Sequence, residues 1–373
     1  MPPTLVFYVS GHGFGHASRV IEVINAILAR RNDVRVIART TAPQWLFDRT
    51  VRSSGPSFAR FELETDTGVA QIDSLHLDEQ ATVARARDFM RTFEDRATAE
   101  AAFLRQHRAA LVVADTPPLG IAAARRAGVP AVALGNFTWD WIYSAYDGAA
   151  DVVDAIRPVY QQADLALRLP MHGGFDVFPQ ILDLPFVARR SARDPIETRR
   201  ALGLPDREPL VLVSFGGYGL EGLDLEAVSR LDGYGVLISG TRPLAQLSEP
   251  VREGRRGSLI PLDEGAMYNA GIRYEDVVRS VEAVVSKPGY GIIAECLANR
   301  TALLYTSRGR FIEYDVLAAE MPRFLRARYI DHADLFAGRW QGHLDALLAQ
   351  PAPAEQPPVD GAAVAAAQLL DMI

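Results

Sequence analysis

The feature that most constrains the fold is a strand-like run that leads directly into a glycine-rich turn and a helix-like pattern. Residues 5–9 are apolar, residues 10–19 read Ser-Gly-His-Gly-Phe-Gly-His-Ala-Ser-Arg, and residues 20–28 have apolar side chains at helical spacing. This order turns backbone N–H groups at the helix N-terminus toward a polar or anionic ligand. The turn also carries His12 and His16, and imidazoles move protons near neutral pH. The segment therefore predicts an α/β fold with an active site at this turn.

Strand-like and helix-like segments alternate along the rest of the first half. Extended segments are expected at residues 34–38, 58–63, 111–115 and 131–134, and helices at residues 43–51, 79–107 and 119–127. Such alternation indicates a parallel sheet with helices on both faces. Residues 170–185 are rich in glycine and proline and lack periodicity, which predicts the approach to an interdomain linker.

The second half repeats this architecture. An apolar run at residues 210–214 leads into a turn with Gly216 and Gly217, and strands are expected at residues 235–239, 283–286 and 302–305. We therefore predict an α/β protein of two Rossmann-like, doubly wound parallel-sheet domains that face a cleft. The predicted domains are residues 1–183 and 184–355, with a C-terminal helix at 360–373 that packs back on the first domain.

Composition excludes several classes of function. The net charge of −7, with no basic block, argues against a nucleic-acid partner. The single cysteine, Cys296, excludes an internal disulfide and a cysteine-based metal cluster, and no acidic metal-binding cluster is evident, so no metal is expected. No apolar run approaches the roughly 18–20 residues of a membrane span, and no signal-type segment opens the chain. These features predict a cytoplasmic protein, with peripheral membrane contact left open.

The first glycine turn matches the dinucleotide-binding fingerprint only in part, because His16 stands where the third glycine belongs. His16 is placed to face a cleft as a base, or alternatively to cap the helix or bond a backbone carbonyl. Asp115 ends a predicted parallel strand, where open α/β sheets place ligand-binding groups. Its carboxylate is expected either to orient an imidazole or to cap the helix that follows Thr-Pro-Pro.

The second half contains the more specific signal. Residues 286–298 again read as strand, glycine turn and helix, with Lys287 adding positive charge where a helix N-terminus receives a phosphate. Glu295 lies about one turn into this helix. A carboxylate there opposes a phosphate unless it binds hydroxyls, so a ribose is its natural partner; the alternative is an exposed helix glutamate.

Aromatic residues follow the predicted strand at 131–134. They are Phe137, Trp139, Trp141, Tyr143 and Tyr146. Such side chains stack on sugar faces at the mouth of a cleft, or fill the core beneath an amphipathic helix. We expect core packing for most of them, and we place Asn136, Trp139 and Asp140 at the cleft.

These motifs resemble the glycosyltransferase-B (GT-B) superfamily, particularly the branch that adds N-acetylglucosamine to lipid-linked muramyl peptide. Residues 11–16 resemble the glycine-histidine loop of that branch, and residues 286–298 with 301–305 resemble its nucleotide-sugar donor motif. Residues 11–19, 136–140 and 286–291 are more similar still to the glycosyltransferase-like N-terminal region of plant arabinokinases.

The resemblance implies a metal-independent hexosyl- or N-acetylhexosaminyl-transferase that uses a UDP-sugar as co-substrate and needs no cofactor. It implies that Glu295 binds the ribose and that Glu313 lies near the donor sugar. The diphosphate would contact Gly216, Gly217, Lys287, Gly289, Tyr290 and Gly291.

On the acceptor side, His16 is the implied base and Asp115 its partner. The cleft there is expected to be lined by His12, Gly13, Phe14 and Gly15. The acceptor is a small or lipid-linked molecule. Residues 310–315 lack the aspartate-glutamine pair of many relatives, so the donor sugar stays open. The alternative functions are a non-catalytic nucleotide-sugar-binding module and a nucleotide-sugar epimerase of the same fold.

Overall fold

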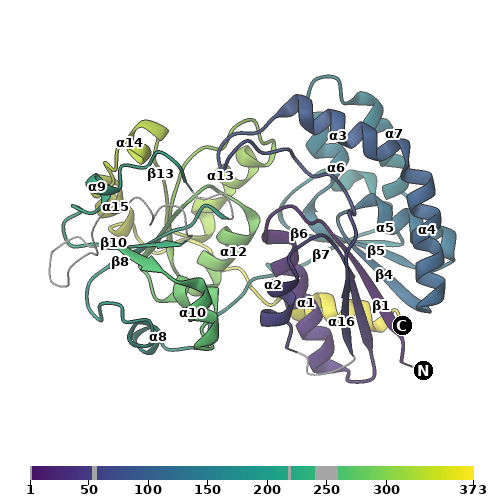
Figure 1. Cartoon of the computed structure of the whole chain (residues 1–373), viewed down its shortest axis with the longest axis horizontal. Helices are drawn as coiled ribbons and strands as arrows, with labels where there is room; N and C mark the ends of the chain where they lie inside the picture. Colours follow the sequence, from purple (N-terminus) through teal and green to yellow (C-terminus); the bar gives the residue numbers. More distant parts are fainter. Residues whose placement is uncertain (1, 53–56, 217–219, 240–258) are drawn as a thin grey trace.

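The computed structural model describes residues 2–52, 57–216, 220–239 and 259–373. Its first lobe is built on a seven-stranded parallel sheet in the order β3-β2-β1-β4-β5-β6-β7 (Figure 1). The strands are β1 (Thr4–Val9), β2 (Arg35–Arg39), β3 (Phe58–Phe61), β4 (Ala109–Asp115), β5 (Ala131–Phe137), β6 (Leu165–Gly173) and β7 (Ile181–Asp183). Polar residues at the carboxyl ends of β1, β4 and β5 therefore lie along one edge of the sheet.

Helices cover both faces of this sheet. They are α1 (Gly15–Arg30), α2 (Gln44–Thr50), α3 (Glu79–Arg91), α4 (Phe93–Gln106), α5 (Pro118–Ala127), α6 (Trp139–Ser144) and α7 (Ala150–Tyr160), with a short 3-10 helix at Phe175–Val177. Along β1, Leu5 and Phe7 pack beneath α1, whereas Val6 and Tyr8 pack beneath the opposite layer of helices. This alternation explains why β1 is apolar throughout: a strand buried on both faces has no solvent-facing side.

The second lobe is built on a six-stranded parallel sheet in the order β10-β9-β8-β11-β12-β13. The strands are β8 (Leu210–Val213), β9 (Gly235–Ser239), β10 (Leu259–Leu262), β11 (Ala283–Ser286), β12 (Ala302–Tyr305) and β13 (Ala327–Tyr329). Its helices are α8 (Pro195–Ala201), α9 (Leu225–Val228), α10 (Glu264–Asn269), α11 (Tyr274–Arg279), α12 (Tyr290–Asn299), α13 (Glu313–Phe324), α14 (His332–Phe336) and α15 (Gln341–Leu348). The prediction of two doubly wound parallel sheets is confirmed.

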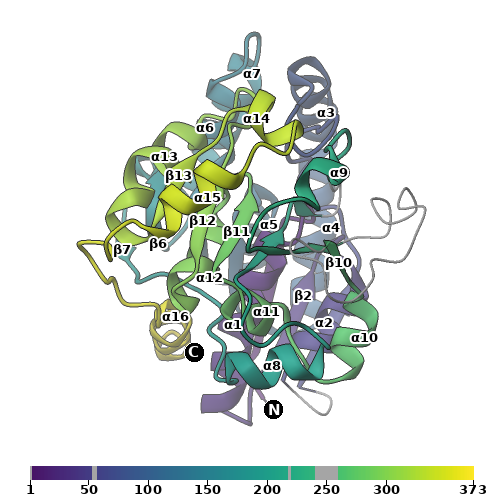
Figure 2. The same ribbon diagram turned by 90° about the vertical axis from the view of Figure 1, so that its left-hand side faces the viewer.

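The last helix, α16 (Gly361–Asp371), returns to the first lobe and lies beside α1 (Figure 2). Its Ala365, Ala366 and Leu369 are buried in the apolar cluster beneath α1. Gly361 starts the helix against the connection that follows β7, where an added Cβ would lie 2.2 Å from the carbonyl oxygen of Pro185. The two lobes are therefore joined by two passages of the chain.

Two predictions of local structure are wrong. The helical region expected over residues 79–107 is two helices, which meet at Thr92. Residues 170–185 were expected to lack regular structure, but they contain the end of β6, a 3-10 helix and the edge strand β7; the connection to the second lobe follows β7, as expected. Pro170 is tolerated because β6 pairs with β7 only over residues 166–168, so its missing N–H interrupts no hydrogen bond of that pairing.

A segment of the first lobe reaches into the core of the second. Leu75 is 1% exposed and packs among Val213, Phe215 and their neighbours around the second sheet. The hydroxyl of Ser74 donates a hydrogen bond to the carbonyl oxygen of Phe215 at 2.9 Å. These contacts hold the lobes together at the carboxyl end of β8.

Candidate active site between the lobes

The N-terminal ends of α1 and α12, one from each lobe, meet between the two sheets. A Cβ added to Gly291 would lie 3.7 Å from the Cα of Gly15, which is van der Waals contact. The two helix ends are therefore direct neighbours. Neither N-cap residue, Phe14 or Gly289, has a side-chain hydrogen bond to its helix. The first N–H groups and the positive ends of two helix dipoles therefore converge here, as a site for an anion requires.

His16 and Asp115 form a hydrogen-bonded pair at this point. The imidazole Nδ1 lies 3.0 Å from Oδ1 of Asp115, whose side chain is fully buried at the end of β4. Burial alone would raise the pKa of Asp115, but the charges of Arg19 and His16 outweigh it and lower the pKa. A carboxylate beside Nδ1 favours the tautomer with the proton on that nitrogen, and in that tautomer Nε2 can accept a proton.

The two structural alternatives for these residues are wrong. The N-cap of α5 is Pro117 without a side-chain hydrogen bond, so Asp115 does not cap that helix. No side chain caps α1, and among the described residues Nδ1 of His16 lies within hydrogen-bond distance of the side chains of Asp115 and Arg19 rather than of a backbone carbonyl.

Arg19 was not predicted as a site residue, although it contacts both members of this pair. Its Nε and Nη2 donate to the two carboxylate oxygens of Asp115 at 2.9 and 2.5 Å, and Nη2 lies 3.1 Å from Nδ1 of His16. Its Nη1 donates to the side-chain oxygen of Asn136. A local signal existed, because residues three apart on a helix lie on the same face.

Asn136 lies within β5 rather than in the loop after it. Its amide Nδ2 donates to the carbonyl oxygen of Pro170 at 2.6 Å while its oxygen accepts from Arg19. The structure therefore brings Asn136 to the pair of His16 and Asp115, as a link between Arg19 and β6.

The second imidazole of the turn, His12, is paired with Asp66. Its Nε2 lies 3.2 Å from both the carbonyl oxygen and Oδ1 of Asp66, and Gly68 backs the ring, where a Cβ would lie 2.3 Å away. Burial favours the neutral ring, but the hydrogen bond and charge of Asp66 prevail and raise the pKa of His12. Asp66 was missed because residues 62–77 have neither strand nor helix periodicity that would place it.

Trp139 and Asp140, which were expected at the cleft, are core residues. Trp139 is 3% exposed, stacks on Tyr143 and donates its indole N–H to Asp66 at 3.0 Å. The carboxylate of Asp140 is buried, and its Oδ2 lies 3.5 Å from Nε of Arg157. Burial raises the pKa of Asp140. By contrast, Phe14 is 38% exposed and meets Trp45 edge to face.

Gly13 and Gly15 lie at the N-terminus of α1 and have open space beside them. Gly13 has a φ of 75°, a conformation that favours glycine, and neither Gly13 nor Gly15 has a neighbour within 4 Å of an added Cβ. The turn is therefore shaped by glycine at Gly13 and leaves space on its outer side.

On the side of the second lobe, Lys287 and Glu313 face the same space. Burial, helped by the nearby charge of Arg308, lowers the pKa of Lys287 from its ordinary 10.5 to about 7. Within the described residues the Lys287 ammonium makes no hydrogen bond or ion pair. Glu313 is 8% exposed, and burial raises its pKa against the charge of Arg308.

Tyr290 joins this group from the start of α12. Its ring packs on that of Phe137 from the first lobe, with 5.9 Å between centroids. Gly216 has a φ of 71° with open space where a Cβ would stand, whereas Gly217 lies outside the described residues. The loops after β8, β11 and β12 thus reach the same edge of the second sheet.

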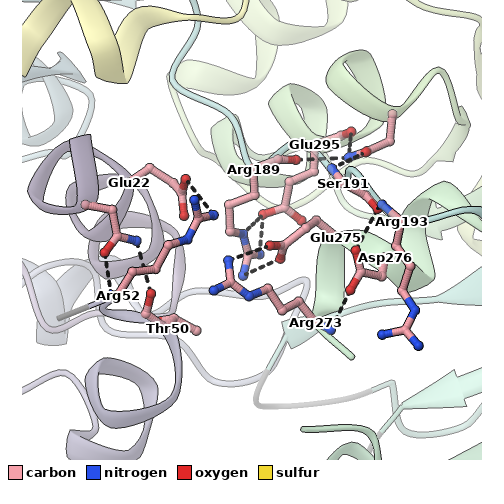
Figure 3. Close-up of polar contacts among 12 residues, drawn as sticks. Glu22, Thr50, Arg52, Arg189, Ser191, Arg193, Arg273, Glu275, Asp276 and Glu295 are labelled. Atoms are coloured by element: carbon pink, nitrogen blue, oxygen red, sulfur yellow. Dashed lines mark hydrogen bonds and ion pairs between the residues drawn. The ribbon is translucent and has the colours of Figure 1, made fainter. Parts of the chain in front are cut away.

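Glu295 is held by an arginine from the connection between the lobes (Figure 3). Nε of Arg189 donates to Oε1 of Glu295 at 2.6 Å, and Nη2 of Arg189 donates to the same oxygen. Glu295 is 5% exposed, so the alternative of an exposed helix glutamate is wrong. No described residue donates to its Oε2, which leaves one carboxylate oxygen for a hydroxyl.

Further charges surround this pair. Glu275 lies 3.9 Å from Arg189, and Glu22 of α1 lies 3.8 Å from Arg52 on the other side of the interface (Figure 3). Burial raises the pKa of Glu295, and Arg189 opposes that shift. The connection between the lobes is therefore anchored by charge next to the residue expected to bind the ribose.

Neither a metal centre nor a membrane helix is found in the described ranges. They contain no group of three or more His, Cys, Asp or Glu side chains arranged to hold a metal ion. None of their helices is both long enough and apolar enough to cross a bilayer.

No protein-family model matches this chain, but a curated protein is similar to it in sequence. L-arabinokinase of Arabidopsis thaliana is 28% identical over 353 residues, which are 91% of this chain and 31% of that protein. The chain therefore spans about a third of the relative's length.

Solved structures share the whole architecture. Phytolacca americana UGT2, complexed with UDP-2-fluoro-glucose and pterostilbene, superposes with a TM-score of 0.62 at 16% identity, over 99% of this chain and 94% of that one. Arabidopsis thaliana UGT89C1 has a TM-score of 0.63 at 12% identity, over 99% and 95% of the chains. CalG4, the calicheamicin glycosyltransferase, has a TM-score of 0.61 at 18% identity, over 100% and 95%.

These similarities do not single out the muramyl-peptide branch, which stays a prediction. What they share with this chain is the pair of parallel-sheet lobes. The chain has the GT-B glycosyltransferase fold.

Proposed function

We propose that this protein transfers a sugar from a UDP-sugar to an acceptor hydroxyl in the space between the lobes. The observation that carries the proposal is the meeting of α1 and α12 at their N-termini, with the pair of His16 and Asp115 on one side and Lys287 on the other. A base and an anion site thus face each other, as an acceptor and a departing diphosphate require.

The donor binds to the second lobe. Its diphosphate lies between Gly216 and the turn formed by Lys287 and Gly289–Gly291, and its ribose hydroxyls donate to Oε2 of Glu295. Its sugar lies toward Glu313. The helix N-terminus and Lys287 supply the positive charge for the diphosphate, so the proposal requires no metal.

The acceptor approaches from the first lobe, beside His12, Phe14 and the glycine turn. Nε2 of His16 takes the proton of the acceptor hydroxyl as its oxygen bonds the anomeric carbon and the bond from that carbon to the diphosphate breaks. Asp115 stabilises the resulting imidazolium. The solved relative with UDP-2-fluoro-glucose and pterostilbene supports a UDP-sugar with a small acceptor. The proposal leaves a lipid-linked acceptor and the hexosyl or N-acetylhexosaminyl nature of the sugar open.

The first test is His16→Gln, which keeps the shape of the side chain but removes the base. UDP affinity, measured by calorimetry, should stay within about twofold because His16 lies on the acceptor side. Transfer, measured as UDP release with a panel of acceptors, should fall by about 10²–10⁴-fold.

The matched control is His107→Gln, which changes a half-buried histidine that follows α4. Unchanged transfer in His16→Gln would remove His16 from the mechanism. Wild-type protein that binds UDP-sugars without transfer or hydrolysis on any acceptor would be a binding module instead.

A further inference from the structure

Arg308, which follows β12, is a buried arginine without a full set of partners. It is 8% exposed, and its Nε has no hydrogen-bond partner among the described residues. Its Nη1 lies 3.7 Å from Oε1 of Glu313, which is ion-pair distance but too long for a hydrogen bond. The guanidinium carbon of Arg308 lies 3.5 Å from the ring centroid of Phe311. The ring covers the flat face of the guanidinium but accepts no hydrogen bond from its N–H groups. Such a group is costly to bury unless a ligand completes it.

Other polar atoms around Arg308 are also unsatisfied. Within the described ranges, the hydroxyls of Tyr290 and Thr306 are buried without a hydrogen-bond partner. Tyr290 starts α12 after β11 and Thr306 follows β12, so both belong to the carboxyl edge of the second sheet, as Arg308 does. Several orphan groups together indicate a ligand with several polar atoms rather than an accident of packing.

The charged side chains around Arg308 indicate what charge such a ligand would carry. Two basic side chains, Arg308 and Lys287, lie near the buried carboxylate of Glu313, and Asp73 also acts on Lys287. Burial lowers the pKa of Arg308, and the charge of Glu313 only partly compensates. Among the described residues, Arg308 therefore has a carboxylate nearby but no charge-assisted hydrogen bond, and an anionic ligand would supply one.

Two anionic positions can be told apart by their place in the fold. Lys287 belongs to the turn at the N-terminus of α12, the position proposed for the diphosphate. Arg308 belongs to the next strand of the sheet, beside Glu313, which faces the donor sugar in that proposal. A sugar with hydroxyls for Glu313 and an anionic substituent for Arg308 fits both residues.

We propose that Arg308 binds a carboxylate on the donor sugar, so that the donor is a UDP-uronic acid. The inference rests on the proposed function, because it takes the position of the diphosphate from it. Arginine suits this task, since a guanidinium edge pairs with a carboxylate through two parallel hydrogen bonds.

Calorimetry with three probes tests the inference: UDP, UDP-glucose and UDP-glucuronate. Wild-type protein should bind UDP-glucuronate at least about tenfold more tightly than UDP-glucose, the effect of a charge-assisted pair. In Arg308→Met this preference should fall to about one, while the affinity for UDP itself stays within about twofold. Arg308→Lys keeps the charge but loses the Nε edge, and should retain only part of the preference.

The matched control is Arg310→Met, an exposed arginine of the same loop, which should keep the full preference. Equal affinity of wild-type protein for the two UDP-sugars would overturn the inference. So would an Arg308→Met variant that loses UDP as strongly as UDP-glucuronate, because Arg308 would then serve the diphosphate. If UDP does not bind wild-type protein at all, the proposed function itself fails.

Discussion

Binding of a UDP-sugar should draw a proton from solution, and Lys287 is the group that takes it. In the free protein its pKa is about 7, so at pH 8 only about a tenth of the molecules carry the ammonium. A diphosphate beside it restores the charged form. Binding at pH 8 should therefore take up about 0.9 proton, and binding at pH 6 only about 0.1.

The same linkage gives the pH dependence of affinity. Because the protonated form is the one that binds, affinity should fall about tenfold between pH 6 and pH 8. Calorimetry in two buffers of different ionisation enthalpy measures the proton uptake directly. A UDP-sugar is the better ligand for this purpose than UDP, since a terminal phosphate with a pKa near 6 exchanges protons itself.

Two variants isolate the contribution of Lys287 from that of other groups. Lys287→Met should abolish the proton uptake and weaken binding at pH 6 by about tenfold or more. Lys287→Arg stays charged at all these pH values, so it should keep affinity and lose the pH dependence. An uptake below about 0.2 proton in the wild type at pH 8, or full uptake in Lys287→Met, would refute the reasoning.

Two further predictions concern the charged pairs of the first lobe. Arg19→Met leaves Asp115 buried with His16 as its remaining partner, so we expect unfolding in urea to become easier by about 3–5 kcal/mol while UDP affinity is kept; an unchanged free energy of unfolding would contradict this. The pair of His12 and Asp66 raises the pKa of the imidazole, so its stabilisation is complete below the unfolded pKa of 6.5 and is lost as pH rises through the folded value. The stability difference between wild type and His12→Asn should therefore shrink from pH 6 to pH 9, and a difference that grows over this range would count against the pair.

Much of the fold followed from local patterns. Apolar runs that end in glycine turns predicted β1, β8 and β11, because a parallel strand buried on both faces must be continuously apolar. The turn at Gly289–Gly291 was placed correctly at a helix start for the same local reason. The break at Thr92 was missed because no glycine or proline interrupts residues 79–107, although Thr92 followed by Asp95 fits a helix-start pattern.

Local sequence patterns identified the residues that carry chemistry, but most of the partners of these residues lie far away in the sequence. Sequence placed His16, Lys287 and Glu295 at the ends of strands and helices, where ligands bind. For Asp115 the sequence left open whether it orients His16, 99 residues away, or caps the next helix, and the tertiary structure decided for His16. The arginine that holds Glu295, 106 residues away, came from the tertiary structure alone. Such pairs depend on which strands are neighbours and on how two lobes meet, and hydrophobic periodicity carries no information on either. Burial, which sets the charge state of Lys287, arises in the same way from packing between distant segments.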